Sequence, residues 1–250
     1  MVLATTFEAS LETRRFDISP GGTRTHLSNF IGAIPWSSPT PWPDDAGLCP
    51  MSFLVETSPG AVIKPHFHRV DQWQLFIGGS ASFGRHAIAP VSLHFAGAYS
   101  PYGPIRAGEN GIAFFTLRNR FDWGTAYMPE FRKELWENRR LFREVKIDCV
   151  APAVLDRFSA ATASTEIILT PEKDGLAAWR LILPPGSSAV GPAPAGGHGQ
   201  SWVVISGAIE HGSKSLATKS CLFVFPDEAA FTFTSAEGAE VWCLQYPKPS

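Results

Sequence analysis

The sequence predicts an all-β protein built from two similar halves. Glycine and proline number 22 and 21 in a chain of 250 residues, which suits many short strands joined by turns. Apolar segments of strand length recur along the chain, and only one stretch has helical spacing. The halves also share residues at a nearly constant separation. This length allows one large β-domain or two small ones, and the repeat favours two.

The internal repeat appears at two separate places. Gln72 and Gln200 lie 128 positions apart, within segments that both continue into apolar strands. Residues 109–117 resemble residues 236–244 with a separation of 127 positions. Because two distant segments share almost the same separation, we interpret the chain as an internal duplication.

Each half is expected to contain at least five strands, separated by Gly- and Pro-containing turns. In the first half the expected strands are residues 51–56, 72–77, 80–88, 91–95 and 112–118. In the second half they are residues 166–170, 178–183, 201–205, 221–225 and 240–245.

One helix is expected between the halves, from Pro129 to Val145. Apolar residues alternate there with charges at roughly helical spacing, and the charges are acidic early and basic late, as suits the helix dipole. The predicted organisation is therefore a first barrel over residues 1–128, a linking helix over 129–146 and a second barrel over 147–250.

The segment from Gly60 to Gly79 carries the clearest functional pattern. His66 and His68 are two residues apart, so both imidazoles point to the same face of an extended strand. A second strand begins at Gln72 after a short turn. If the two strands form a hairpin, Gln72 faces the histidines and three potential metal ligands converge.

This segment resembles the first signature motif of the cupin family. The two glycines and two histidines of that motif are matched by Gly60, His66, His68 and Gly79. Gln72 stands where the motif has a glutamate. The resemblance implies two cupin-type jelly-roll barrels, a bicupin, each with an interior between two sheets. Cupins commonly bind iron, manganese, zinc, nickel or copper and act as dioxygenases, isomerases, decarboxylases or lyases, while others only bind ligands.

The second cupin motif is weak in this chain. The segment expected to carry it, residues 101–108, contains no histidine, and Tyr102 falls about where the last metal ligand belongs. His94 lies eight residues before Tyr102 and reaches the site only if the loop folds back. The candidate metal ligands are therefore His66, His68, Gln72 and His94.

Three side chains are candidates for contact with a substrate. Gln74 shares a strand face with Gln72 and should point into the barrel. Tyr102 is suited to act as a ligand, an acid or a hydrogen-bond donor. Arg118 ends an alternating strand and could hold a carboxylate. The alternative for each is structural: a buried amide, a packed tyrosine and a surface arginine.

The second half lacks the histidine pair. At the same separation, Pro194 replaces His66 and Gly196 replaces His68. His198 lies nearby but has no partner by spacing, and a single histidine does not make a metal site. We therefore expect a degenerate second barrel without metal.

The composition argues against some partners. The net charge is −2 with no long run of one sign, which gives no reason to expect nucleic acid or an anionic membrane as a partner. No segment is apolar enough to span a bilayer, and four scattered cysteines suit reduced thiols in the cytoplasm. The apolar face of Trp73, Leu75 and Ile77 must be covered, either inside the monomer or in a homodimer.

Two functions remain open at this stage. The first is a metal-dependent enzyme, in which a divalent ion polarises a small oxygen-bearing substrate; whether it is an isomerase, a lyase or a dioxygenase is unresolved. The second is a non-catalytic bicupin that binds a small molecule, which the glutamine at position 72 and the weak second motif favour. Metal content distinguishes them.

Overall fold

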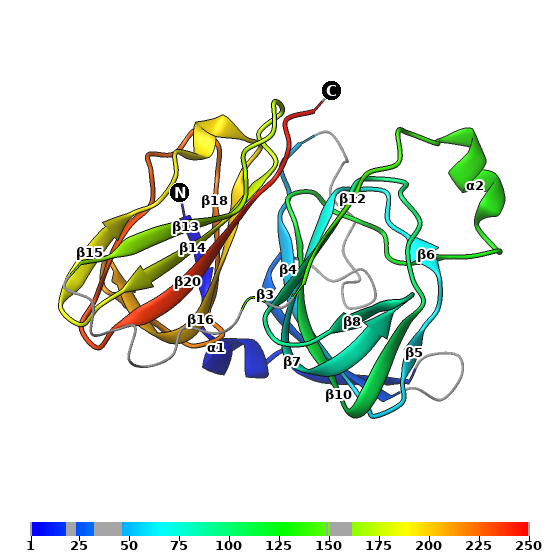
Figure 1. Ribbon diagram of the computed structural model, residues 1–250, viewed down its shortest axis with the longest axis horizontal. Coiled ribbons are helices and arrows are strands. Elements are labelled where there is room, and N and C mark those ends of the chain that lie inside the picture. The colour runs from blue at the N-terminus through cyan, green and yellow to red at the C-terminus, as the bar shows by residue number, and fades with distance from the viewer. Residues whose placement is uncertain (1, 19–23, 33–46, 149, 151–161, 250) are drawn as a thin grey trace. The chain divides into compact units, whose positions relative to one another are not determined.

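The structure, a computed structural model, describes residues 2–18, 24–32, 47–148, 150 and 162–249. The chain forms two compact units, and the described residues are mostly strand (Figure 1). We name residues 12–152 the first barrel, and residues 1–11 together with 153–250 the second barrel. The all-β prediction is confirmed.

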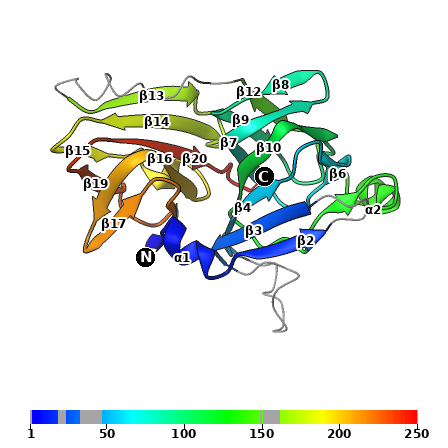
Figure 2. The ribbon, with the colours of Figure 1, turned by 90° about the horizontal axis from the view of Figure 1, so that it is seen from below.

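A nine-stranded antiparallel sheet dominates the first barrel. Its strands are β2 (Arg15–Ile18), β3 (Arg24–Ile31), β4 (Met51–Thr57), β5 (Val62–Ile63), β7 (Gln72–Phe83), β8 (His86–Ile88), β9 (Ser92–Ala96), β10 (Ile105–Arg118) and β12 (Glu144–Ile147). The spatial order is β12-β9-β7-β10-β4-β3-β2, with β5 paired to β10 and β8 to β7 (Figure 2). The short strands β6 (His66–Phe67) and β11 (Ala126–Tyr127) form a separate pair.

The second barrel also has a nine-stranded sheet, in the order β1-β18-β16-β20-β14-β13, with β15, β17 and β19 off this path. Its strands are β1 (Val2–Thr5), β13 (Ser164–Leu169), β14 (Ala177–Leu183), β15 (Ser187–Val190), β16 (Gln200–His211), β17 (Lys214–Ala217), β18 (Cys221–Val224), β19 (Thr232–Ser235) and β20 (Ala239–Gln245). Its described residues also form two short helices, α1 (Phe7–Leu11) and the 3₁₀ turn η3 (Pro194–Gly196). Because β1 pairs with β18, the chain's first residues lie in the second barrel rather than in the first, where residues 1–128 were expected.

The internal repeat is visible in the strands. Strands β7 and β16 each have 12 residues, and β4 and β14 each have 7. Gly79 and Gly207 occupy the same point of β7 and β16, with φ of 71° and 70°. A Cβ at either position would collide with a backbone carbonyl, that of Gly111 or of Gly238. Both barrels therefore use a glycine at the same close approach of two strands.

The predicted linking helix is mostly wrong. Only α2 (Arg132–Glu137) is helical, and β12 follows it and pairs with β9. The helix has no buried residue, and its first residue has no side-chain cap. Trp136 and Leu141 are 69% and 92% exposed. Because short helices need a packed apolar face, the helix ends at Glu137; residues 138–143 have no regular structure, and β12 then pairs with β9.

The apolar face of β7 is covered in the structure. Trp73 and Leu75 are fully buried, and Trp73 packs on Phe95 at 4.9 Å between ring centroids. Packing inside the monomer therefore accounts for these two residues, whereas Ile77 is half-buried, and the homodimer stays a prediction. None of the helices among the described residues is long and apolar enough to cross a membrane.

Candidate ligand site in the first barrel

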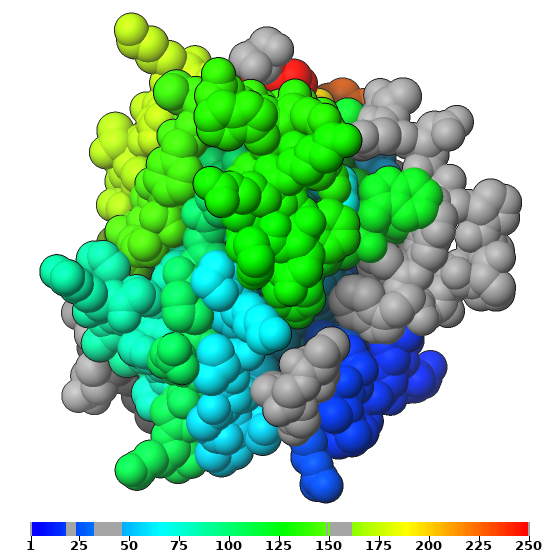
Figure 3. Space-filling view, turned by 90° about the vertical axis from the view of Figure 1, so that its right-hand side faces the viewer, coloured from blue at the N-terminus to red at the C-terminus, as the bar shows by residue number. Residues whose placement is uncertain are grey.

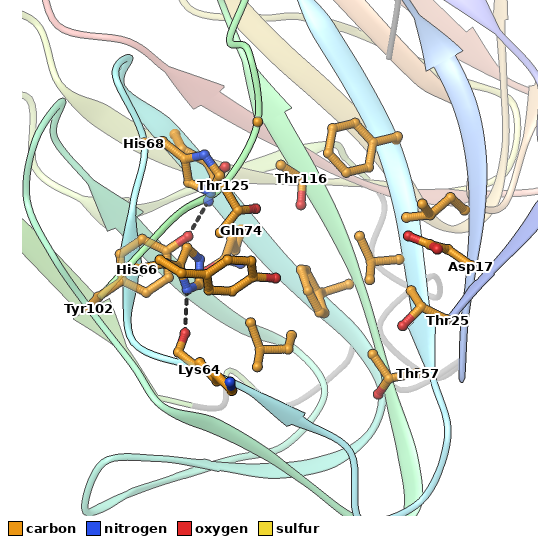
Figure 4. Close-up of a pocket in the computed structure, with 18 of the residues that line it drawn as sticks. Asp17, Thr25, Thr57, Lys64, His66, His68, Gln74, Tyr102, Thr116 and Thr125 are labelled. Atoms are coloured by element: carbon orange, nitrogen blue, oxygen red, sulfur yellow. Dashed lines mark hydrogen bonds between the residues drawn. The ribbon is translucent and has the colours of Figure 1, made fainter. Parts of the chain in front are cut away.

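The first barrel encloses a cavity of about 560 Å³. Most of its wall is apolar and comes from β3, β4, β5 and β10: Leu27, Phe53, Val55, Ile63 and Phe114. Polar side chains gather on one side, where His66, His68, Gln74 and Tyr102 lie together, whereas Asp17, Thr25 and Thr57 lie across the cavity (Figure 4). The site is therefore a pocket with apolar sides, a histidine-bearing side that we call the polar wall, and a few further polar groups opposite it.

The two histidines reach this wall by a route that differs from the predicted hairpin. Strand β6 does not pair with β7; it pairs with β11 and makes a bridge to Tyr102. The His66 N–H donates to the Tyr102 carbonyl at 3.0 Å, and the Tyr102 N–H donates back at 2.9 Å. The His66 and His68 rings are nevertheless close, with centroids 5.2 Å apart. Backbone pairing across the barrel, rather than a hairpin turn, brings them beside Gln72.

His66 is a neutral imidazole, and only one of its two ring nitrogens is bonded to the Lys64 carbonyl. Its Nδ1 donates to the Lys64 carbonyl at 2.7 Å, which leaves the lone pair on Nε2. Burial, together with the positive potential of His68 and Arg118, lowers the pKa of His66 from 6.5 to about 3. His66 therefore offers an acceptor, not a positive charge, near neutral pH.

His68 is held between Asp122 and Arg118. Its Nδ1 donates to Asp122 Oδ2 at 2.8 Å. The Arg118 Nη2 atom lies 3.1 Å from His68 Nδ1 and 3.3 Å from His68 Nε2, and since Nδ1 donates its proton to Asp122, only Nε2 can accept from Arg118. Burial alone would raise the pKa of Asp122, but Arg118 and His68 outweigh it and hold this pKa well below its usual value. The three side chains thus form a buried group with one positive and one negative charge.

Gln72 links Arg118 to Tyr102. Its Oε1 accepts from Arg118 Nε at 2.9 Å, and its Nε2 donates to the Tyr102 hydroxyl oxygen at 2.7 Å. Arg118 is a donor only, so it fixes which end of the amide faces it. Burial raises the pKa of Tyr102 far above its ordinary value. The hydroxyl therefore keeps its proton and can donate it to a ligand.

Gln74 and His94 lie on opposite sides of the polar wall. Gln74 lines the cavity, but His94 does not; it packs behind Tyr102, with ring centroids 4.7 Å apart. His94 contacts the Gln74 amide through Nδ1 at 2.8 Å and Glu144 through Nε2 at 3.1 Å. His94 therefore supports Gln74 from behind and does not join the other two histidines.

The cavity is bordered on one face of the barrel by β2, β5 and the segment that enters α2. The partly exposed side chains Ile18, Val62 and Phe131 line it there, at 57%, 37% and 39% exposure. Figure 3 shows this face, with the α2 segment above β5 and β6. Arg69 anchors the segment through two hydrogen bonds to Glu134, at 2.6 and 2.8 Å.

Known structures share this architecture over the whole chain. A bacterial pirin from Escherichia coli in complex with nickel(II) matches with a TM-score of 0.60 and 11% identity, covering 100% of both chains. An oxalate decarboxylase from Bacillus subtilis with Mn(II) centres matches with a TM-score of 0.59 and 14% identity, covering 96% of this chain and 77% of the other. The chain has the bicupin fold.

A provisionally assigned dioxygenase from Nostoc punctiforme is a third bicupin match. Its TM-score is 0.56 at 12% identity, covering 98% of this chain and 78% of that chain. No family model matches the sequence, and no curated protein matches it. At these identities the likeness concerns the fold, and the chemistry of this bicupin has to be read from its own residues.

A divalent metal ion does not fit the site in this arrangement. His66 Nε2 carries a lone pair suited to a metal, but the lone pair of His68 already accepts from Arg118. The Gln72 oxygen also accepts from Arg118, and this guanidinium would repel a second cation. Within the described parts of the chain, no group of three or more His, Cys, Asp or Glu side chains could hold a metal.

Six of the seven predicted site residues of this bicupin line one cavity: His66, His68, Gln72, Gln74, Tyr102 and Arg118. His94 is the one that does not line it. Their roles stay predictions. Sequence reasoning missed Asp122 and Glu144, which hold His68 and His94. Neither carboxylate falls in a motif. The four-residue step from Arg118 to Asp122 is the one signal that the sequence offers.

Proposed function

We propose that the first barrel of this bicupin is a binding site for a small organic molecule with an apolar body and one polar end. The observation that carries the proposal is the cavity of about 560 Å³, with apolar walls and polar groups gathered on one side. Pockets of this size and lining are the usual sites for small ligands. The partly exposed residues Val62 and Phe131 border the route by which a ligand would enter.

The polar groups are suited to orient a ligand rather than to move protons. A general base works best with a pKa near the working pH, and the pKa of His66 is about 3. Tyr102 holds its proton firmly because burial raises its pKa. Asp122 is ionised but is already engaged by His68 and Arg118. These properties favour a non-catalytic binding protein.

The test is a binding screen with a blocked pocket as its control. Small aromatic and branched aliphatic compounds are screened by thermal shift, and hits are measured by calorimetry. Thr57 lines the cavity, so Thr57→Trp should abolish binding of every true hit. Ser213→Trp, on an exposed turn of the second barrel, should leave binding unchanged. Hits that survive Thr57→Trp would place binding elsewhere and contradict the proposal.

A metal-dependent enzyme acting on a small oxygen-bearing molecule is the second candidate. The favouring observation is that both histidines donate through Nδ1, to the Lys64 carbonyl and to Asp122. Metal-binding histidines are usually held in this way, with Nε2 toward the ion. This function requires Arg118 to leave His68. One equivalent of a transition metal in the purified protein, lost in His66→Ala, would establish it over the first proposal.

A further inference from the structure

The geometry points to Arg118 as the resident cation of the first barrel: its guanidinium stands beside the histidines in place of a metal ion and selects a ligand with a carboxylate head group. The ligand part of this inference rests on the proposed binding function. The statement that Arg118 stands in place of a metal ion does not rest on the binding function, because it concerns only which cation lies at the polar wall.

The Arg118 side chain is buried and is held by several polar contacts. Its side chain is 3% exposed, Nε donates to Gln72 at 2.9 Å, and Nη2 lies 3.3 Å from His68 Nε2. Its Cζ lies 5.5 Å from the centre of the Phe53 ring, which lines the same cavity. Contacts on several sides therefore fix the guanidinium at the polar wall.

One nitrogen of Arg118 lacks a hydrogen bond. Nη1 lies 3.3 Å from Asp122 Oδ2, a distance that makes an ion pair, but it has no hydrogen bond. This nitrogen is itself buried, and a buried donor without a hydrogen-bond partner is costly; because Arg118 lines the cavity, a small movement of its side chain toward a ligand oxygen would satisfy the donor. Arg118 thus has both the position and the unused capacity to bind an acceptor.

A carboxylate matches the donors that are available. Arginine binds the two oxygens of a carboxylate in a planar arrangement, and the Tyr102 hydroxyl can supply a second donor nearby. Asp17 lines the wall across from the histidines (Figure 4), which disfavours a second negative charge at that end. The apolar walls between them suit a hydrocarbon or aromatic body. The ligand class is therefore a small monocarboxylate with an apolar body.

The same placement explains why a metal ion is disfavoured. Arg118 already supplies a positive charge that Asp122 balances. A divalent ion at His66 and His68 would add two further charges beside a buried cation, and no carboxylate stands at the Gln72 position to offset them. Gln72 and Arg118 therefore act together: the neutral amide accepts from the guanidinium, and the guanidinium replaces the metal.

The head-group preference is tested with matched acids and amides. Calorimetry compares benzoate and phenylacetate with their primary amides on the wild-type chain. The acids should bind about tenfold to a hundredfold more tightly, and Arg118→Gln should remove this difference. Arg118→Lys should keep part of it. Arg106→Gln, on the exposed part of the same strand, should change nothing. Circular dichroism checks that each variant is folded.

The outcomes separate this inference from the proposed function. Amides that bind the pocket as tightly as acids would overturn the head-group inference and leave the binding function intact. Acids that bind equally well to Arg118→Gln would overturn the role of Arg118. If neither acids nor amides bind but other hits are blocked by Thr57→Trp, the binding function stands and the carboxylate class is wrong.

The statement that Arg118 stands in place of a metal ion is tested by a gain of function. The double change Gln72→Glu and Arg118→Gln removes the cation and adds a carboxylate, so it should take up about one equivalent of nickel(II). The wild type should take up almost none, and adding His66→Ala to the double variant should abolish the gain. Stoichiometric nickel in the wild type, or none in a folded double variant, would overturn the inference.

Discussion

The two barrels use one strand framework for different interiors. In the first, Gln72 on β7 accepts from Arg118 at the end of β10. At the matching places in the second, Gln200 on β16 donates to Gln245 at the end of β20, at 2.9 Å. The exchange of an arginine for a glutamine turns a charged pair into a neutral pair of amides. The same arrangement of strands therefore accepts either an arginine or a glutamine at this place, so the positive charge of Arg118 is not required for the fold.

A second exchange changes how the interior is filled at one position. Gln74 lines the cavity of the first barrel, whereas Trp202 stands at the matching position of the second and is fully buried. The Trp202 ring packs on Phe231 and Phe233, with centroids 5.2 and 5.8 Å apart, and its Nε1 donates to Gln200. One large side chain therefore fills the space that the first barrel leaves open.

The largest expected effect comes from removing that side chain. Trp202→Ala should lower the free energy of unfolding by about 3–5 kcal/mol, because a fully buried ring leaves a cavity behind. Gln74→Ala should cost only about 1 kcal/mol, since its side chain already borders open space. Chemical denaturation of both variants gives the comparison. Equal losses would mean that the two interiors do not differ as described.

The next largest effect is expected from replacing the glycine that both barrels have at the same point of β7 and β16. Gly79→Ala and Gly207→Ala should each cost about 1–3 kcal/mol, because both residues have positive φ and face a carbonyl that a Cβ would strike. The two losses should be similar if the duplicated framework makes the same demand twice. Ser213→Ala is the control on an exposed turn. A large loss at one glycine and none at the other would contradict a shared framework.

The smallest effect concerns pH. His66 is neutral when folded, with a pKa lowered to about 3, whereas the unfolded chain takes up a proton near pH 6.5. Below pH 6.5 the unfolded state binds more protons, so stability falls by up to about 1.4 kcal/mol per pH unit for this group.

Hydrogen exchange of β7 and β16 between pH 7 and pH 5 measures the loss in each barrel separately. Protection of β7 should fall more than that of β16, because neither His198 nor His211 in the second barrel is fully buried. His66→Gln should reduce the difference. Equal pH dependence in the two strands, unchanged in His66→Gln, would contradict the assignment of His66.

Much of the fold could be predicted because strand patterns and turns are local. Alternating apolar residues and glycines located most strands, and the repeat located the two barrels. The segment after α2 could not be predicted in the same way. Residues 138–145 carry a helical spacing, but residues 138–143 have no regular structure and the last two belong to β12, whose pairing with β9 depends on residues far apart in the sequence.

The site was predictable only where its residues are close in sequence. His66 and His68 follow from a two-residue step on a strand. The partners that set their chemistry do not: Asp122 lies 54 positions from His68, and Arg118 lies 50. His94 was misleading because strand direction places it behind Tyr102 and against Glu144. Contacts between distant segments therefore determine the charge of the site.

The central claim is that Arg118, not a metal ion, is the cation of the first barrel. The most direct measurement is elemental analysis of the wild-type protein, purified without chelator or histidine tag. We expect far less than one equivalent of any transition metal, with the same result in His66→Ala. About one equivalent of a single metal in the wild type, lost in His66→Ala, would contradict it.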